Sequence, residues 1–169
     1  YASMTGATED MAAAVEVGAA AVAHTRVVRK RVADVTSDDL LAASAIVVGT
    51  PVHNAGMIAE VAQFLDRWPF EQMNDRVGAA FVAAGATSAG EELTTLNLLG
   101  AMLVHRLVLV GGETWQAAFG ASAITEEGQP ADRQGKVAER DREEARALGR
   151  RVATLAHALA QGGWRSAKP

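Results

Sequence analysis

Apolar residues in this chain gather in short unbroken runs, which are separated by longer stretches where apolar and polar positions recur at helical spacing. The unbroken runs cover residues 45–49, 77–84 and 107–110. Runs of this length that stay apolar at consecutive positions are typical of parallel strands buried on both faces of a sheet. We therefore predict three buried strands, each followed by glycine or small polar residues.

The stretches between these runs carry helical patterns. They cover residues 11–23, 36–43, 57–68, 93–103 and 136–159. Thr36, followed by two aspartates, is a typical N-cap for the short second helix. Regular alternation of strands and helices predicts an open parallel α/β sheet with helices on both faces, formed by a single domain over residues 1–169.

Three further expectations concern segments outside this pattern. Residues 25–35 alternate basic and apolar side chains, which predicts a strand with one wet face at an edge of the sheet. Residues 113–134 contain glycine and proline with few periodic apolar positions, so we expect a loop there. The loop at residues 3–8 should follow a central apolar strand, so we expect several apolar residues before Tyr1 in the natural protein.

The first eight residues predict an anion site. They combine hydroxyl side chains with one glycine directly before a helical stretch. The backbone N–H groups of such a loop and the partial positive charge of the helix N-terminus favour phosphate. The Gly-Lys-Ser/Thr ending of a nucleotide triphosphatase loop and the spaced glycines of a dinucleotide site are missing. Since no Lys or Arg precedes Arg26, we expect hydrogen bonds and the helix dipole, without a countercharge, to hold a phosphate monoester.

Composition narrows the functional classes. The chain has 169 residues, a net charge of −4, 49% hydrophobic residues and no cysteine. Thiolate catalysis, disulfides and cysteine-based metal sites are therefore excluded, and the histidines lack metal-ligand spacing. The acidic balance argues against nucleic acid as a partner. Neither an apolar run of about 20 residues nor a signal peptide is visible, so we expect a cytoplasmic protein without a membrane span.

Several segments resemble the flavodoxin-like FMN proteins, and most nearly the NAD(P)H:quinone oxidoreductases once described as Trp-repressor-binding proteins. Residues 3–8 resemble the FMN phosphate loop of that family. Residues 49–57, followed by Phe-Leu-Asp-Arg at 64–67, resemble its isoalloxazine loop and the next helix. Residues 84–92 resemble its third flavin loop, and Phe-Gly-Ala-Ser at 119–122 is similar to its Tyr-Gly-Ala segment.

The resemblance implies a flavodoxin-like sheet of five strands in the order 2-1-3-4-5, with the first strand largely absent from this sequence. It implies FMN as the cofactor, NAD(P)H as the electron donor, and two-electron reduction of a quinone or similar small acceptor by ping-pong hydride transfer. A homodimer or homotetramer is also implied. Two other functions stay open, namely a flavodoxin-type electron carrier and a general NADPH-dependent FMN reductase.

The resemblance also assigns roles to individual residues. His105 is implied as a flavin contact and as a catalytic proton donor, although a histidine at the end of a helix also suits the helix dipole. Trp115 and Phe119 are expected beside the flavin, at a subunit contact or in the core. No metal ligand is expected. The implied cofactor-binding residues are Ser3, Met4, Thr5, Gly6, Ala7, Thr8, Thr50, Pro51, Val52, His53, Asn54, Ala55, Gly56, Ala84, Gly85, Ala86, Thr87, Ser88, Gly90 and His105.

Overall fold

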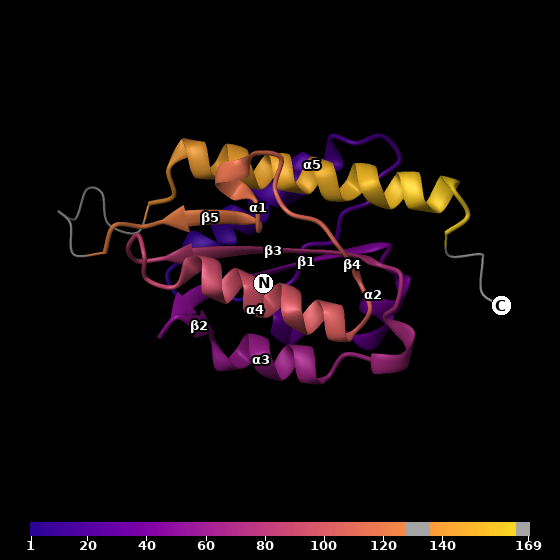
Figure 1. Ribbon diagram of the computed structural model, residues 1–169, viewed down its shortest axis with the longest axis horizontal. Coiled ribbons are helices and arrows are strands. Elements are labelled where there is room, and N and C mark those ends of the chain that lie inside the picture. Colours follow the sequence, from indigo (N-terminus) through magenta and orange to yellow (C-terminus); the bar gives the residue numbers. More distant parts are fainter. Residues whose placement is uncertain (128–135, 165–169) are drawn as a thin grey trace.

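The computed structural model describes residues 1–127 and 136–164, which form a largely parallel sheet between two layers of helices (Figure 1). Strand β1 (Ala45–His53) pairs in parallel with β3 (Val77–Ala84), in a register that runs from Ala45 opposite Val77 to Pro51 opposite Ala83. Strands β4 (Val108–Leu109) and β5 (Ala121–Ile124) both pair in parallel with β3. Because β1 takes one edge of β3 along almost its whole length, β4 and β5 share the other edge.

Helices cover both faces of the sheet. Helices α1 (Ala7–Ala20) and α5 (Glu139–Gln161) pack on one face around the buried side chains of Met11 and Leu148. Helices α2 (Ser37–Ala42), α3 (Ala59–Asp66) and α4 (Glu91–Val104) lie on the other face around Val61 and Leu98. Within the described part of the chain, no helix combines the length and apolarity needed to cross a bilayer.

Several of the predicted elements are confirmed. All eight positions of β3 are buried, as its unbroken apolar run predicts. Helix α2 begins at the predicted cap, where Thr36 Oγ1 accepts a hydrogen bond from Asp39 N at 3.2 Å and the Asp39 carboxylate accepts one from Thr36 N at 2.9 Å. This reciprocal pair satisfies two backbone donors that the helix leaves unpaired.

Strand β1 extends further than predicted. It continues past Gly49 to His53 because its last residues pair with the short antiparallel strand β2 (Gly56–Met57). The two-residue turn between them consists of Asn54 and Ala55, with φ of 50° and 57°. Left-handed backbone at both positions is the geometry that closes a tight hairpin. The expected loop at 50–57 is therefore a hairpin.

Two other predictions are wrong. Residues 25–31 form no strand, and Val32–Asp34 form a 3-10 helix (η1), because a cavity, and no neighbouring strand, lies beside the expected strand. The expected loop at 113–134 contains a 3-10 helix, η3 (Trp115–Ala117), and strand β5. Residues 128–134 of that expected loop lie outside the described residues.

Candidate functional site

The three loops predicted from the sequence come together at the carboxyl edge of the sheet. Ala2 N donates to Gly49 O at 3.1 Å, which places the following residues 3–6 beside the end of β1. A Cβ built on Gly90 would lie 2.5 Å from Cβ of Ala55, so the third loop touches the β1–β2 turn. Strand β2 and the carboxyl end of β5 lie on this same side of the molecule (Figure 1). Ligands of open parallel sheets bind at such an edge.

The loop at residues 3–8 presents unused hydrogen-bond donors. Ser3 Oγ accepts from Gly6 N at 3.1 Å and from Glu9 N at 3.3 Å, which holds the loop against the start of α1. The backbone N–H groups of Thr5, Ala7 and Thr8 make no hydrogen bond with any described residue. A Cβ on Gly6 would meet no atom within 4 Å, so the space beside the loop is open. Free amides at a helix N-terminus next to open space fit a phosphate group.

A cation lies beside this loop, contrary to the expectation that no countercharge is present. Arg31 donates from Nη1 to Ser3 O at 3.4 Å and from Nη2 to Glu9 Oε2 at 2.9 Å. Its side chain is 48% exposed, so solvent screens much of its charge. Sequence reasoning missed Arg31 because residues 25–35 were assigned to a solvent-facing strand. The run of four basic residues between 26 and 31 was the available signal.

The hairpin at residues 50–57 is fixed by a buried hydroxyl. Thr50 is fully buried, and its Oγ1 donates to Pro51 O at 3.0 Å and accepts from Ile58 N at 3.3 Å. The hydroxyl of Thr50 is therefore used internally, where it positions the hairpin, and a cofactor contact at Thr50 stays a prediction. His53 and Asn54, in contrast, are exposed at the tip of the hairpin.

The third loop, residues 84–90, begins at a buried residue and has an exposed tip. Ala84 is 1% exposed, and its carbonyl accepts from both N and Oγ1 of Thr125, while a cofactor contact at Ala84 stays a prediction. Ala86, Thr87 and Ser88 are exposed. Glu91 Oε1 accepts from Ser88 N at 2.9 Å, while its Oε2 is buried without a partner. Burial raises the pKa of Glu91, but hydrogen bonds from backbone N–H groups outweigh it and leave this pKa below its usual value.

The structure places His105 at the opposite edge of the sheet. His105 ends α4, and the next residue, Arg106, accepts through its carbonyl from Asp75 N, just before β3 begins. Its ring lies 5.2 Å from the ring of Trp68 and 5.1 Å from that of Phe70. Burial, with a smaller contribution from Arg106, lowers the pKa of His105. Because the 14 residues of α4 span about 20 Å, the implied flavin contact is corrected to a core position.

Trp115 and Phe119 belong to an excursion between β4 and β5. Gly112 N and Gly120 N both donate to Ala117 O, which closes the excursion on itself. Trp115 is 83% exposed and Phe119 is 42% exposed, so neither side chain is part of the core. A position beside the flavin or at a subunit contact stays a prediction for both residues.

Comparison with known proteins agrees with this arrangement. The model of the NADPH-dependent FMN reductase family matches residues 12–121. A protein named NAD(P)H dehydrogenase (quinone) from Paracoccus denitrificans is 30% identical over 204 aligned residues, which cover 99% of this chain and 96% of the relative.

Solved structures show the same fold. A WrbA-like flavodoxin from Agrobacterium tumefaciens matches with a TM-score of 0.69 at 24% identity, covering 92% of this chain and 93% of that one. A flavodoxin from the domain Archaea matches with a TM-score of 0.70 at 21% identity, covering 93% and 95% of the two chains. With its flavodoxin-like fold and a family match that spans most of its length, the chain belongs to the NADPH-dependent FMN reductase family.

Proposed function

We propose that this protein is an FMN-dependent NAD(P)H oxidoreductase that passes two electrons to a quinone or a similar small acceptor. The observation that carries the proposal is the group of unpaired backbone donors at Thr5, Ala7 and Thr8, beside two further loops at the carboxyl edge of the sheet. Membership of the FMN reductase family supports FMN as the group bound there. A quinone is proposed as acceptor because the Paracoccus relative is named for one.

Each loop has a distinct role in this proposal. Residues 3–8 hold the phosphate through backbone N–H groups and the helix N-terminus. Residues 53–56 and 85–90 border the flavin ring, where small side chains let the main chain approach closely. When bound, FMN supplies the hydride and electron-transfer chemistry. His53 is the histidine at this edge, and we assign to its exposed imidazole the proton given to the acceptor oxygen.

The test begins with FMN binding and continues with turnover. FMN added to the purified protein should lose fluorescence as it binds, NAD(P)H should bleach the flavin absorbance, and a quinone should restore it. Gly6→Val should weaken FMN binding, because Gly6 has a φ of 100° that a β-branched residue resists. Gly100→Ala is the matched control, since its Cβ meets no atom within 4 Å and lies far from the loops. If the protein binds FMN but NAD(P)H does not bleach the flavin absorbance, the proposed oxidoreductase activity is contradicted.

A flavodoxin-type electron carrier is the second candidate, favoured by the match to the archaeal flavodoxin fold. It would bind FMN at the same loops but would need a separate reductase, so NAD(P)H alone would leave its flavin oxidised. A general FMN reductase would instead release reduced FMN, and free FMN would show saturation kinetics as a substrate. The homo-oligomeric state and the cytoplasmic location stay predictions.

A further inference from the structure

Two carboxylates that the proposed function does not use lie against the third loop. Glu91 reaches the loop from the start of α4, where its Oε1 accepts from Ser88 N at 2.9 Å. Glu127 reaches it from the segment after β5, where its N–H donates to Gly85 O at 2.7 Å. A Cβ built on Gly85 would lie 2.6 Å from Oε2 of Glu127. The loop therefore has one acidic side chain near its tip and another at its base.

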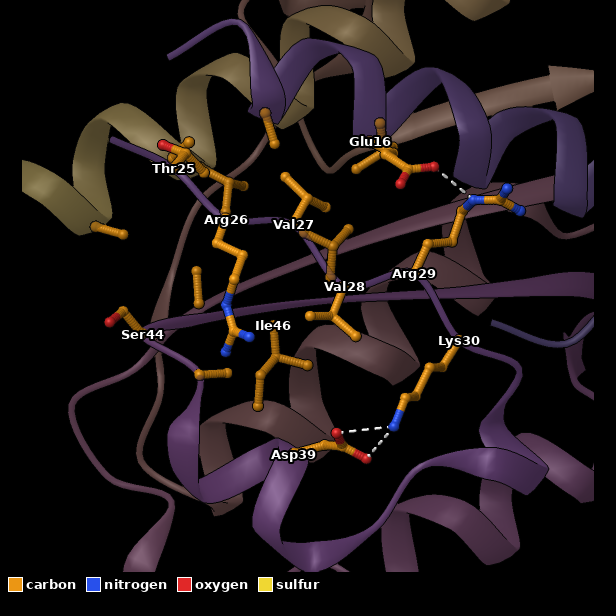
Figure 2. A pocket seen from close by; sticks show the side chains of 18 of the residues that line it. Glu16, Thr25, Arg26, Val27, Val28, Arg29, Lys30, Asp39, Ser44 and Ile46 are labelled. Carbon is orange, nitrogen blue, oxygen red and sulfur yellow. Dashed lines mark hydrogen bonds and ion pairs between the residues drawn. The ribbon is translucent and has the colours of Figure 1, made fainter. Parts of the chain in front are cut away.

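Carboxylates beside the phosphate loop, in contrast, are paired with arginine. Glu9, in the first turn of α1, accepts from Arg31 Nη2 at 2.9 Å. Figure 2, a view into the cavity beside residues 25–31, shows Glu16 of the same helix paired with Arg29, at 2.7 Å. An opposite charge at such a distance cancels most of the field that a carboxylate exerts on a ligand. Glu9 and Glu16 therefore add little net negative charge at this end of the site.

The two carboxylates at the third loop lack such a partner. Neither Glu91 nor Glu127 forms an ion pair within residues 1–127 and 136–164. Oε2 of Glu91 is buried and makes no hydrogen bond with a described residue. Although burial raises it, the pKa of Glu91 is held below its usual value by backbone N–H groups of the loop, so this carboxylate is ionised at neutral pH. The third loop is therefore the negative end of the site.

The position of these charges is important because residues 85–90 border the flavin ring in the proposed function, on which this inference rests. A molecule that takes electrons from the ring must lie against it, and therefore close to both carboxylates. In a partly solvated site, one like charge about 8 Å away weakens the binding of an anion by roughly two- to sixfold. A neutral molecule of the same size does not have this penalty.

We propose that Glu91 and Glu127 determine the acceptor specificity of the site, by favouring neutral and cationic quinones over anionic ones. An anionic quinone at the ring meets two unpaired charges of its own sign, and such repulsion is an effective way to reject a ligand. There are two rival explanations. In one, solvent screens both carboxylates completely. In the other, Glu91 serves only to hold the loop in shape.

The first test measures whether the two charges act on the ring, and it needs no acceptor. Electrons added to FMN make the ring more negative, so a nearby carboxylate opposes reduction. The midpoint potential of bound FMN should therefore become more positive in Glu91→Gln and in Glu127→Gln, and most positive in the double variant. Asp38→Asn is the matched control, because it removes one charge from the first turn of α2, which precedes the amino end of β1. It should leave the potential unchanged.

The second test follows the acceptor reaction alone. Bound FMN is reduced by light without oxygen and mixed with 1,4-naphthoquinone or with its 2-sulfonate. Two electrons and two protons pass to the quinone, which becomes the hydroquinone, while the absorbance of oxidised FMN returns. The rate constant for the sulfonate, divided by that for naphthoquinone, should be about tenfold higher in the double variant than in the unchanged protein. Added salt should raise the same ratio in the unchanged protein, because Glu127 is exposed.

Two variants at one position separate charge from structure. Glu91→Gln keeps an oxygen that can accept from Ser88 N, whereas Glu91→Ala removes this hydrogen bond as well. If the charge is what matters, both variants should change the potential and the quinone ratio in the same direction. If Glu91 only holds the loop, Glu91→Gln should behave as the unchanged protein does.

The quinone ratio decides the outcome. An unchanged ratio in the double variant would overturn the proposal, whatever happens to the potential. An equal change in Asp38→Asn would also overturn it, because the net charge of the protein would then be the cause. Since no NAD(P)H is added, a protein that NAD(P)H fails to reduce contradicts the proposed function and leaves this test intact. If FMN does not bind, both proposals fail together.

Discussion

Replacing Gly90 with alanine should push apart the two loops that we assign to the flavin ring. Gly90 caps the start of α4 with a φ of 100°, a region that costs a residue with a Cβ about 1–2 kcal/mol. The new Cβ would also lie 2.5 Å from Cβ and 2.6 Å from Cα of Ala55, in the turn of the β1–β2 hairpin. Overpacking of this kind costs about 1–3 kcal/mol.

The two effects together predict that Gly90→Ala lowers the free energy of unfolding by about 2–5 kcal/mol. Urea unfolding followed by circular dichroism measures this change. Gly100→Ala in the same helix is the control and should raise the free energy of unfolding by about 0.5–1 kcal/mol, because it meets no neighbour and improves helix propensity. FMN affinity should fall in Gly90→Ala and stay unchanged in Gly100→Ala.

A double mutant separates the clash from the backbone strain. Ala55→Gly removes the Cβ at 2.5 Å and also relieves the positive φ of 57° at Ala55. In the Ala55→Gly background, Gly90→Ala should therefore cost less than it does alone, with a coupling energy of about 1 kcal/mol or more. Costs that simply add would refute the contact between the two loops.

Three further changes test the phosphate loop and the buried histidine at the other edge of the sheet. Ser3→Ala removes the acceptor for Gly6 N and Glu9 N, so the free energy of unfolding should fall by about 1 kcal/mol and FMN titration should show weaker binding. Arg31→Ala should weaken FMN binding by severalfold at low salt and by less at high salt, because its exposed charge is screened; equal loss at both salt concentrations would count against an electrostatic role. The pKa of His105 lies below its ordinary 6.5, so as pH falls the unfolded chain binds this proton before the folded protein does. The free energy of unfolding therefore decreases as pH falls below about 6.5. Urea midpoints measured against pH should show a smaller decrease for His105→Gln than for the unchanged protein.

The pattern of the sequence predicted the central strands well and the margins of the sheet poorly. Strand β3 was predictable because burial on both faces demands apolar residues at every position. Strand β5 was missed because Ala121 and Ala123, although fully buried, are small and give little signal between glycine-rich neighbours. Residues 25–31 have the alternation of a strand, but pairing also needs a neighbour, and a single segment does not reveal whether one is present.

The site was predicted in outline, with errors at particular residues. The free amides near Gly6 follow from a small-residue loop before a helix, and they lie where the sequence places them. The flavin contact expected for His105 rested on the resemblance. The alternation of strands and helices predicts instead that His105 lies away from the three loops. A helix that connects two parallel strands runs back against them, so its last residue lies at the amino edge. The internal use of the Thr50 hydroxyl depends on Ile58 N, a contact that no local pattern specifies.

The strand position beside β3 that faces away from β1 is interrupted, and the interruption affects how this protein behaves in concentrated solution. An uninterrupted row of free N–H and C=O groups along a sheet is a template on which other chains add strands and aggregate. Here the strand next to β3 is broken into β4 and β5, which cover two and four residues, and the excursion between them departs from the line of the sheet. Shortening that excursion until β4 and β5 fuse would restore a long template, and the protein would gain a tendency to form fibrils.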